Sequence, residues 1–196
     1  MLLVAGSFDD ELESARVLLG RNWRAVGFVG AGVDEVLAPL GSSREGLLGP
    51  AQWIATVTTE PDEGPNSEWF CERYRLAVGG HPPYPGAQAF AAGLLAARCL
   101  RESPENSPRR LVESRLPESP LHVGASEDAT QLAVARRLAC RTLYGDFRLD
   151  PVTGVQVGHR LITVQWQREC RRAIWPPEIA EATLEYPLRT ARRVGY

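Results

Sequence analysis

The fold of this chain is decided by residues 2–30, LLVAGSFDDELESARVLLGRNWRAVGFVG. The apolar run at 2–5 is long enough for a buried parallel strand, and the run at 25–29 predicts a second one. Between them, Ser7 stands three residues before an aspartate, a spacing typical of a helix start, and apolar side chains recur at helical spacing over 12–19. A strand, a helix and a second strand in this order predict a parallel sheet.

The same alternation continues along the chain. A second helix is expected at 33–40, ended by Gly41, and a third strand at 46–49. The remaining expected elements are helices at 68–78, 86–100 and 126–140, and a half-buried strand at 162–167 paired as a hairpin with 172–175.

Three further stretches carry their own expectations. The helix at 86–100 is apolar nearly all round, which predicts burial on several sides. Residues 101–122 are rich in Pro, Ser and charged side chains, which predicts an exposed insertion. The last residues, with Arg189, Arg192 and Arg193, are expected to form a frayed basic tail.

Length and charge exclude several classes of protein. The 196 residues suit one domain, or two lobes that share a hinge, and the 44% hydrophobic content predicts a packed core. With 22 basic and 24 acidic side chains the net charge is -2, whereas nucleic-acid binders usually carry a basic surplus. No apolar run approaches the ~20 residues of a membrane span, and the apolar start at Met1 is too short for a signal peptide.

The search for catalytic and metal-binding motifs is negative. The chain has no GxxxxGK loop, no GxSxG elbow and no HExxH, so we expect neither an enzyme nor a bound cofactor. The four cysteines form no CxxC pair, which makes a zinc site unexpected. Cys99 and Cys140 each end an expected helix and could form a disulfide in an oxidising compartment, although two buried free thiols fit equally well. The acidic residues over 9–13 are explained by the start of a helix.

Five stretches together point to a family. In chain order they are VAGSFDDELESARVL (4–18), EGLLGPAQW (45–53), ERYRLAVGGHPPYPGAQAFAAGLLAA (72–97), TLYGDFRLDPVTGVQVGH (142–159) and VQWQ with IWPP (164–177). This ordered set resembles the later half of the type I periplasmic-type solute-binding proteins, the leucine/isoleucine/valine-binding-like receptors of ABC transporters. The resemblance implies an incomplete α/β fold, with remnants of two parallel-sheet lobes joined by hinge crossings.

The resemblance also implies a division of the chain. Residues 1–53 would be the tail of the second ligand-binding lobe, 54–145 the last helices of the first lobe, and 146–196 the return to the second lobe. The chain would then be truncated, lacking the first half of the receptor and its export signal. It would act outside the cytoplasm, bind a small solute and deliver it to an ABC permease.

Family members grip the ligand from two loops of the second lobe. The loop after the first strand corresponds to Ser7, Phe8 and Asp9, and the loop after the next strand to Gly30, Ala31 and Gly32. In the second loop the family's amino-acid binders hold the ligand ammonium with a carboxylate, which this chain offers no earlier than Asp34. An amino acid is therefore the family default, and another small polar or aromatic metabolite is an alternative. A ligand-sensing regulatory protein of the same fold is the alternative function.

Overall fold

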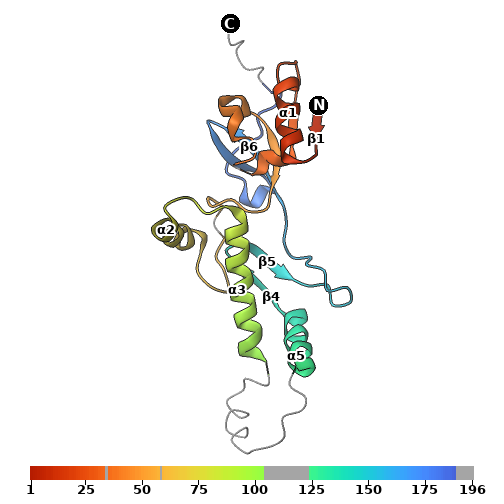
Figure 1. Ribbon diagram of the computed structural model, residues 1–196, viewed down its shortest axis with the longest axis vertical. Coiled ribbons are helices and arrows are strands. Elements are labelled where there is room, and N and C mark those ends of the chain that lie inside the picture. The colour runs from red at the N-terminus through yellow and green to blue at the C-terminus, as the bar shows by residue number, and fades with distance from the viewer. Residues whose placement is uncertain (34, 58, 104–123, 189–196) are drawn as a thin grey trace, which may run out of the picture. The chain divides into compact units, whose positions relative to one another are not determined.

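The protein is described by a computed structural model that covers residues 1–33, 35–57, 59–103 and 124–188 (Figure 1). The chain falls into two compact units, Met1–Val57 with Leu161–Tyr196, and Thr58–Arg160. The chain passes from the first unit to the second after Val57 and returns after Arg160. Both passages lie later in the chain than the boundaries expected after residues 53 and 145. The second lies later because a strand beginning at Gly145 pairs within the second unit. Asp34, most of the expected insertion and the three tail arginines lie outside the described residues.

A five-stranded sheet with the order β1-β2-β3-β6-β7 forms the centre of the first unit. Its strands are β1 Leu2–Val4, β2 Val26–Phe28, β3 Leu48–Ala51, β6 Ile162–Gln167 and β7 Cys170–Trp175. The first three run parallel, while β6 is antiparallel to β3 and β7 is antiparallel to β6. The parallel opening that the sequence predicts is confirmed, and so is the hairpin that follows residue 161.

Helix α1, Phe8–Leu18, covers one face of this sheet. The Ser7 hydroxyl oxygen accepts a hydrogen bond from the backbone N–H of Asp10 at 3.3 Å, so the predicted cap is present. Ala15 is fully buried and packs in one cluster with the sheet residues Val26, Phe28 and Trp166. The apolar stripe of α1 therefore makes the core of the unit.

The prediction of a helix at 33–40 is wrong. The 3-10 segment η1, Val29–Gly32, ends before this region, and a second one, η2 Ala38–Arg44, begins only near its end. Residues 35–37 between them form a turn. A proline lies in the first positions of η2, and Gly41 interrupts it with φ of 53° and ψ of -129°. Pro removes a backbone donor and Gly permits a positive φ, so the segment turns where an α-helix would continue.

Strand β6 differs from its expected half-buried pattern because both of its faces are covered. Val164 and Trp166 belong to the hydrophobic clusters on one side. On the other side, the buried Gln167 side-chain nitrogen donates to the backbone oxygen of Thr183 at 2.9 Å. The buried Gln165 accepts from the backbone N–H of Glu185 at 2.8 Å. The segment after the short 3-10 turn η4, Pro177–Ile179, thus covers the second face of the strand.

The described residues of the second unit form three helices and a two-stranded hairpin. Its elements are α2 Ser67–Val78, α3 Tyr84–Glu102, α5 Gly124–Arg137, β4 Ala139–Thr142 and β5 Gly145–Arg148. Helices α2 and α3 meet through aromatic side chains, with the ring centroids of Phe70 and Phe90 5.0 Å apart. A small cluster of Cys99, Val134, Leu138 and Cys140 joins α3, α5 and β4.

Two expectations for this unit are wrong. The helix expected at 126–140 ends at Arg137, so Cys140 lies in β4, where it pairs with Phe147 of β5. Helix α3 extends over 84–102, but its buried residues are confined to Ala87, Ala91 and Cys99. The apolar side chains on its other face are exposed: Ala89, Ala92, Ala96 and Leu100. The apolar composition of 86–100 predicted helix α3 correctly. Its burial is limited because neighbouring elements cover one face of the helix alone.

Candidate ligand-binding site

The two loops that the sequence assigns to a ligand follow neighbouring parallel strands. Val4 at the end of β1 is in register with Phe28 at the end of β2. The loops after these strands therefore begin at the same edge of the sheet, the carboxyl edge where open parallel sheets bind ligands. The topology brings the six predicted residues to one edge of the first unit.

Ser7, Phe8 and Asp9 are the exposed half of the predicted site. The Ser7 hydroxyl donates a hydrogen bond of 2.6 Å to Oδ2 of Asp10, so it is already engaged with the helix start. The Phe8 ring is 51% exposed and offers an apolar surface. Asp9 adds an exposed carboxylate in the first turn of α1, where Asp10 and Glu11 are also acidic. An aromatic face beside negative charge suits a ligand with an apolar part and a cationic group.

Gly30, Ala31 and Gly32 form the other half, and all three are buried. The indole N–H of Trp166 donates to the backbone oxygen of Ala31 at 2.8 Å. The Arg171 guanidinium donates to the backbone oxygen of Gly32. These contacts commit much of the loop to the interior of the unit, and the ligand contacts predicted for it stay a prediction.

Close packing against β3 explains the glycine at position 32. A Cβ atom on Gly32 would lie 1.7 Å from the backbone oxygen of Pro50. Because the clash is with backbone, no movement of a side chain could relieve it. A Cβ on Gly30 would lie 2.4 Å from Cγ1 of Val36. Glycine at these two positions therefore allows the loop to approach its neighbours closely.

Glu11 is the residue of this site that sequence reasoning missed. It is fully buried, and Oε2 of its carboxylate accepts a hydrogen bond of 2.6 Å from the backbone N–H of Gly30. Oε1 accepts a longer one of 3.4 Å from the backbone N–H of Gly6. One carboxylate thus links the loops after β1 and β2. A signal was available, because Glu11 stands four residues before Ala15 on the buried stripe of α1.

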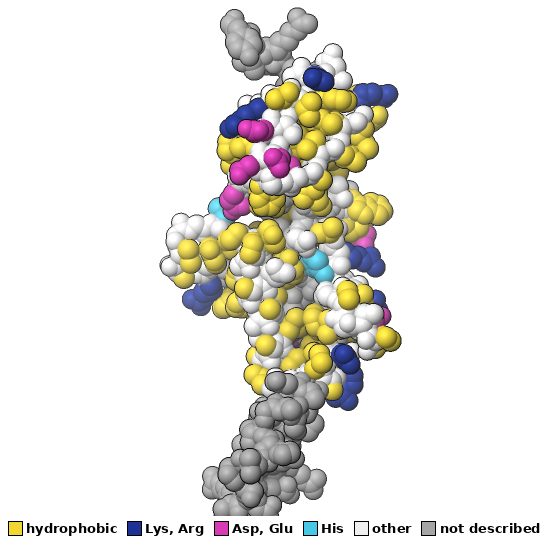
Figure 2. Space-filling view, turned by 45° about the vertical axis from the view of Figure 1, so that its right-hand side comes forward, with side chains coloured by type: hydrophobic (Ala, Val, Ile, Leu, Met, Phe, Trp, Pro, Cys, Tyr) yellow, Lys and Arg dark blue, Asp and Glu magenta, His cyan; other side chains and the backbone are white. Residues whose placement is uncertain are grey.

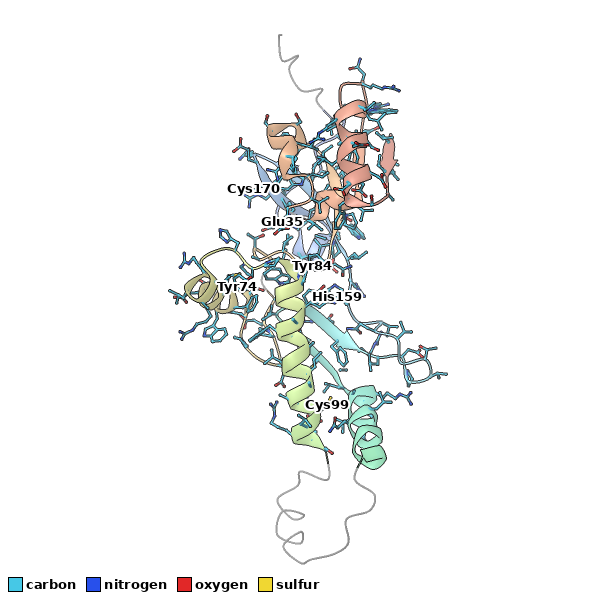
Figure 3. All side chains as sticks on the ribbon, in the orientation of Figure 1. Glu35, Tyr74, Tyr84, Cys99, His159 and Cys170 are labelled. Atoms are coloured by element: carbon cyan, nitrogen blue, oxygen red, sulfur yellow. The ribbon has the colours of Figure 1, made fainter. Side chains whose placement is uncertain are left out.

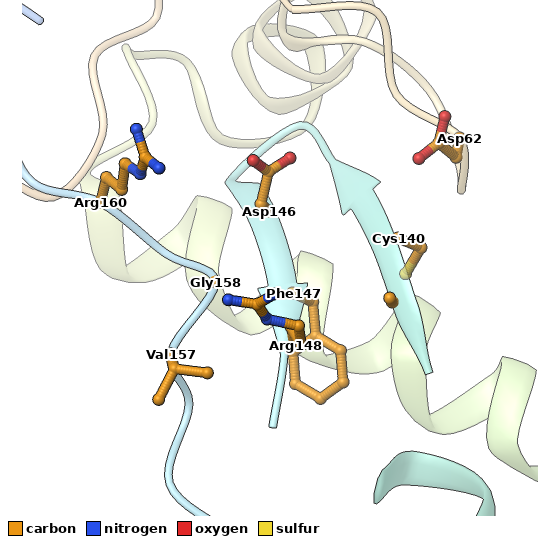
Figure 4. Close-up of a pocket in the computed structure, with 9 residues that line it drawn as sticks. Asp62, Cys140, Asp146, Phe147, Arg148, Val157, Gly158 and Arg160 are labelled. Carbon is orange, nitrogen blue, oxygen red and sulfur yellow. The ribbon is translucent and has the colours of Figure 1, made fainter. Parts of the chain in front are cut away.

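A pocket of about 350 Å³ lies in the second unit, beside the β4–β5 hairpin (Figure 4). Its lining carries both signs of charge together with apolar side chains: Asp62, Ala139, Cys140, Asp146, Phe147, Arg148, Val157, Gly158 and Arg160. Both carboxylates also contact Arg141, since Asp62 accepts from its backbone N–H at 2.9 Å and Asp146 from its guanidinium at 2.8 Å. Nothing in the sequence pattern marked this pocket, because its residues come from three separate segments.

Aromatic rings of Tyr144 and His159 stack in the same unit, with centroids 4.7 Å apart and planes 9° from parallel. His159 is labelled in Figure 3, as is Tyr84 at the start of α3. Burial, and then the nearby Tyr84, raise the pKa of Tyr144 to about 12. The phenol oxygen of Tyr144 is buried and has no hydrogen-bond partner among the described residues.

Cys99 and Cys140 are buried free thiols in one hydrophobic cluster. Burial is the main cause that raises the pKa of both above the ordinary value. Their pairing as a disulfide stays a prediction. Within the described ranges, no group of His, Cys, Asp and Glu side chains is placed to hold a metal ion. Nor is any helix of those ranges both long and apolar enough to cross a membrane.

Known proteins resemble this chain in structure, at low sequence identity. No family model and no curated protein sequence matches the chain. A crystal structure from Silicibacter pomeroyi, provisionally described as a branched-chain amino acid ABC transporter, superposes with a TM-score of 0.64 at 14% identity. The match covers 94% of this chain and 47% of that one. A second structure, with the same provisional description and from Rhodospirillum rubrum, superposes with a TM-score of 0.58 at 17% identity. That match covers 86% of this chain and 42% of its counterpart.

These likenesses define the class of fold. The chain has part of the type I periplasmic-binding-protein fold and spans about half the length of both solved structures. The resemblance drawn from the five sequence stretches is thereby confirmed at the level of fold, as is the incomplete α/β class. At 14% and 17% identity the likeness extends to fold alone.

Proposed function

We propose that this chain is the later half of an extracytoplasmic solute-binding component of an ABC importer. The observation that carries the proposal is the superposition of 94% of the chain on the Silicibacter pomeroyi structure. In this proposal the protein binds a small molecule and hands it to permease subunits, without chemical change to the ligand. It is a part of a receptor whose other half completes the two lobes.

An amino-acid-like ligand fits the exposed half of the site. Phe8 offers an aromatic face, and Asp9 offers a carboxylate for an ammonium group. The acidic first turn of α1 offsets the positive end of the helix dipole, which would otherwise disfavour a cation there. Asp9 would thus supply the negative charge that the loop 30–32 lacks. In this proposal the buried Glu11 holds the backbone of that loop through its hydrogen bond with the Gly30 N–H and does not itself contact the ligand.

The test is a ligand-observed NMR titration of the 196-residue chain with L-leucine, L-isoleucine and L-valine, because one incomplete site is expected to bind weakly. Asp9→Asn should weaken the signal for the ammonium-bearing ligand by about tenfold in affinity, the loss of one charge-assisted contact. Glu13→Gln, on an exposed residue of the same helix, should leave it unchanged. Equal binding by both variants, or equal binding of N-acetyl-leucine, would remove Asp9 from the proposal.

A further inference from the structure

The pocket beside the β4–β5 hairpin lies wholly within the second unit. Its volume of about 350 Å³ is within the range of small-molecule sites. Four of its lining residues are charged, namely Asp62, Asp146, Arg148 and Arg160. Figure 2 brings the right-hand side of Figure 1 forward and shows basic, acidic and apolar side chains interspersed over this unit. The pocket is therefore suited to a ligand that itself carries charge.

Asp62 forms the wall of the pocket on the β4 side. Its backbone N–H donates to the Arg141 oxygen at 2.8 Å, and its Oδ2 accepts from the Arg141 N–H at 2.9 Å. The backbone N–H of Glu63 donates to the same Arg141 oxygen at 3.0 Å. These bonds fix the loop that carries Asp62 along the outer edge of β4, so its carboxylate is in place before a ligand binds.

Residues 156–160 form the wall on the β5 side. The side-chain oxygen of Gln156 accepts from the Arg148 N–H at 2.9 Å, and the Val157 N–H donates to the Arg148 oxygen at 2.8 Å. A Cβ on Gly158 would lie 2.8 Å from the backbone nitrogen of Arg148, so this segment approaches the strand more closely than a side chain would allow. The approach holds the second wall against the outer edge of β5.

The two walls differ in charge. In Figure 4, Arg148 and Arg160 lie on the β5 side of the hairpin. Asp62 lies on the β4 side, and Asp146 lies between the two walls. The Asp146 carboxylate accepts from the Arg141 guanidinium at 2.8 Å, so its charge is already offset. Asp62 accepts from a neutral backbone N–H, and no described residue pairs with the exposed Arg148 guanidinium. The pocket thus offers positive charge at one wall and negative charge at the other.

The hairpin sets the distance between the two walls. Neighbouring strands lie about 4.8 Å apart, and each wall is a further segment hydrogen-bonded outside one of them. An α-amino acid carries its ammonium and carboxylate on a single carbon atom, which is too close to reach both walls. A molecule with these groups at opposite ends of a short chain spans the pocket, and its methylene groups pack on Val157.

We propose that this pocket binds a small zwitterion whose ammonium and carboxylate stand at opposite ends, as in an ω-amino acid. The carboxylate binds Arg148 and Arg160, because a planar guanidinium matches the two oxygen atoms of a carboxylate. The ammonium binds Asp62. This site shares no residue with the loops 7–9 and 30–32 of the first unit, so the inference does not rest on the proposed function.

The experiment titrates the 196-residue chain with δ-aminovalerate and follows the NMR shifts of its backbone amides. We expect saturable shifts at Asp62, Arg148 and Val157. Valerate lacks the ammonium, pentylamine lacks the carboxylate, and glycine carries both groups on one carbon atom. Each should bind about tenfold more weakly than δ-aminovalerate, because one charged contact is lost. Arg148→Gln and Asp62→Asn should each weaken the binding of δ-aminovalerate by about tenfold for the same reason.

Arg75→Gln and Glu72→Gln are the matched controls, since they remove the same charges from exposed residues of α2. Both should bind δ-aminovalerate as the unchanged chain does. The comparison of the four ligands uses the unchanged chain, so it decides the question even if a pocket variant fails to fold.

Three results would overturn the proposal. One is the absence of shifts at the hairpin, or shifts confined to the loops 7–9 and 30–32. Another is glycine or valerate binding at the hairpin as tightly as δ-aminovalerate. The third is unchanged affinity in folded Arg148→Gln and Asp62→Asn proteins. Saturable shifts at the hairpin without any shift at 7–9 would support this site whatever the outcome of the leucine titration.

Discussion

Glu11 and Gly30 are joined by a hydrogen bond of 2.6 Å between a buried carboxylate oxygen and a backbone N–H. The contact links the first turns of α1 to the loop that follows β2. A polar group buried in this way stabilises the fold only while its partner is present. The carboxylate therefore fixes the position of the loop that the sequence assigns to the ligand.

Replacing Glu11 tests this contact. Glu11→Ala should lower the free energy of unfolding by about 2 kcal/mol, because the Gly30 N–H is left buried without an acceptor. Glu11→Gln keeps an acceptor oxygen and should lose less. Urea denaturation followed by circular dichroism measures both. Glu13→Ala, on the exposed side of the same helix, is the matched control. A Glu11→Ala protein as stable as the control would show that the contact contributes nothing.

Gln165 holds the segment that covers the second face of β6. Its side-chain nitrogen donates to the backbone oxygens of Glu185 at 3.0 Å and Gly46 at 3.2 Å, and its oxygen accepts from the Glu185 N–H at 2.8 Å. Gln165→Ala should lower the free energy of unfolding by about 2 kcal/mol, and amide exchange at Glu185 should become faster. The exposed Gln52→Ala is the control. Unchanged exchange at Glu185 would contradict this role.

Tyr144 should make stability depend on pH in the alkaline range. Its pKa is raised to about 12, so the folded state holds the phenol proton more tightly than the unfolded chain, whose tyrosines titrate near ~10. The stability from this group is fully present below ~10 and is lost as the pH rises toward 12. Thermal unfolding at several pH values, compared with Tyr144→Phe, measures the difference. Parallel curves for the two proteins would contradict the raised pKa.

The same substitution tests the buried hydroxyl at neutral pH. Tyr144→Phe removes an oxygen that has no hydrogen-bond partner among the described residues and keeps the ring stacked on His159. We expect the free energy of unfolding to rise by up to about 1 kcal/mol, because a desolvated polar group is removed. Tyr74→Phe serves as the control for loss of a phenol. A clear loss of stability would mean that the hydroxyl is satisfied in solution.

Thiol labelling should separate the cysteines by burial. Cys170 is exposed, whereas Cys99 and Cys140 are buried and their pKa values are raised mainly by that burial. Because the thiolate is the reactive form, iodoacetamide should modify Cys170 first in the folded protein. Mass analysis of timed samples gives the order. In material exported through an oxidising compartment, labelling of Cys99 and Cys140 only after reduction would instead establish the disulfide.

The sequence by itself determined the parts of this protein that depend on local pattern. The apolar run at 2–5, the Ser7 cap and the stripe of α1 predicted the parallel opening, because period and capping are properties of neighbouring residues. The five ordered stretches predicted the class of fold, which the superposition on two solved structures confirms. The edge of the sheet where Ser7 and Gly30 come together follows from the same pattern.

Only the tertiary structure decided how these elements are covered and connected. Glu11 is one of the acidic residues in the first turn of α1, as is usual at a helix start. Its burial depends on Gly30, 19 positions away. Gln165 occupies a position in the alternating pattern of β6 that predicts a solvent-facing side chain. It is buried because the later segment near Glu185 packs over it. Helix α3 is apolar nearly all round, yet one face stays open because nothing in the described residues packs on it. Burial is a property of contacts between distant segments. The order of residues can mark a position on a buried stripe, as it does for Glu11, but the segment that covers it is decided by the tertiary structure.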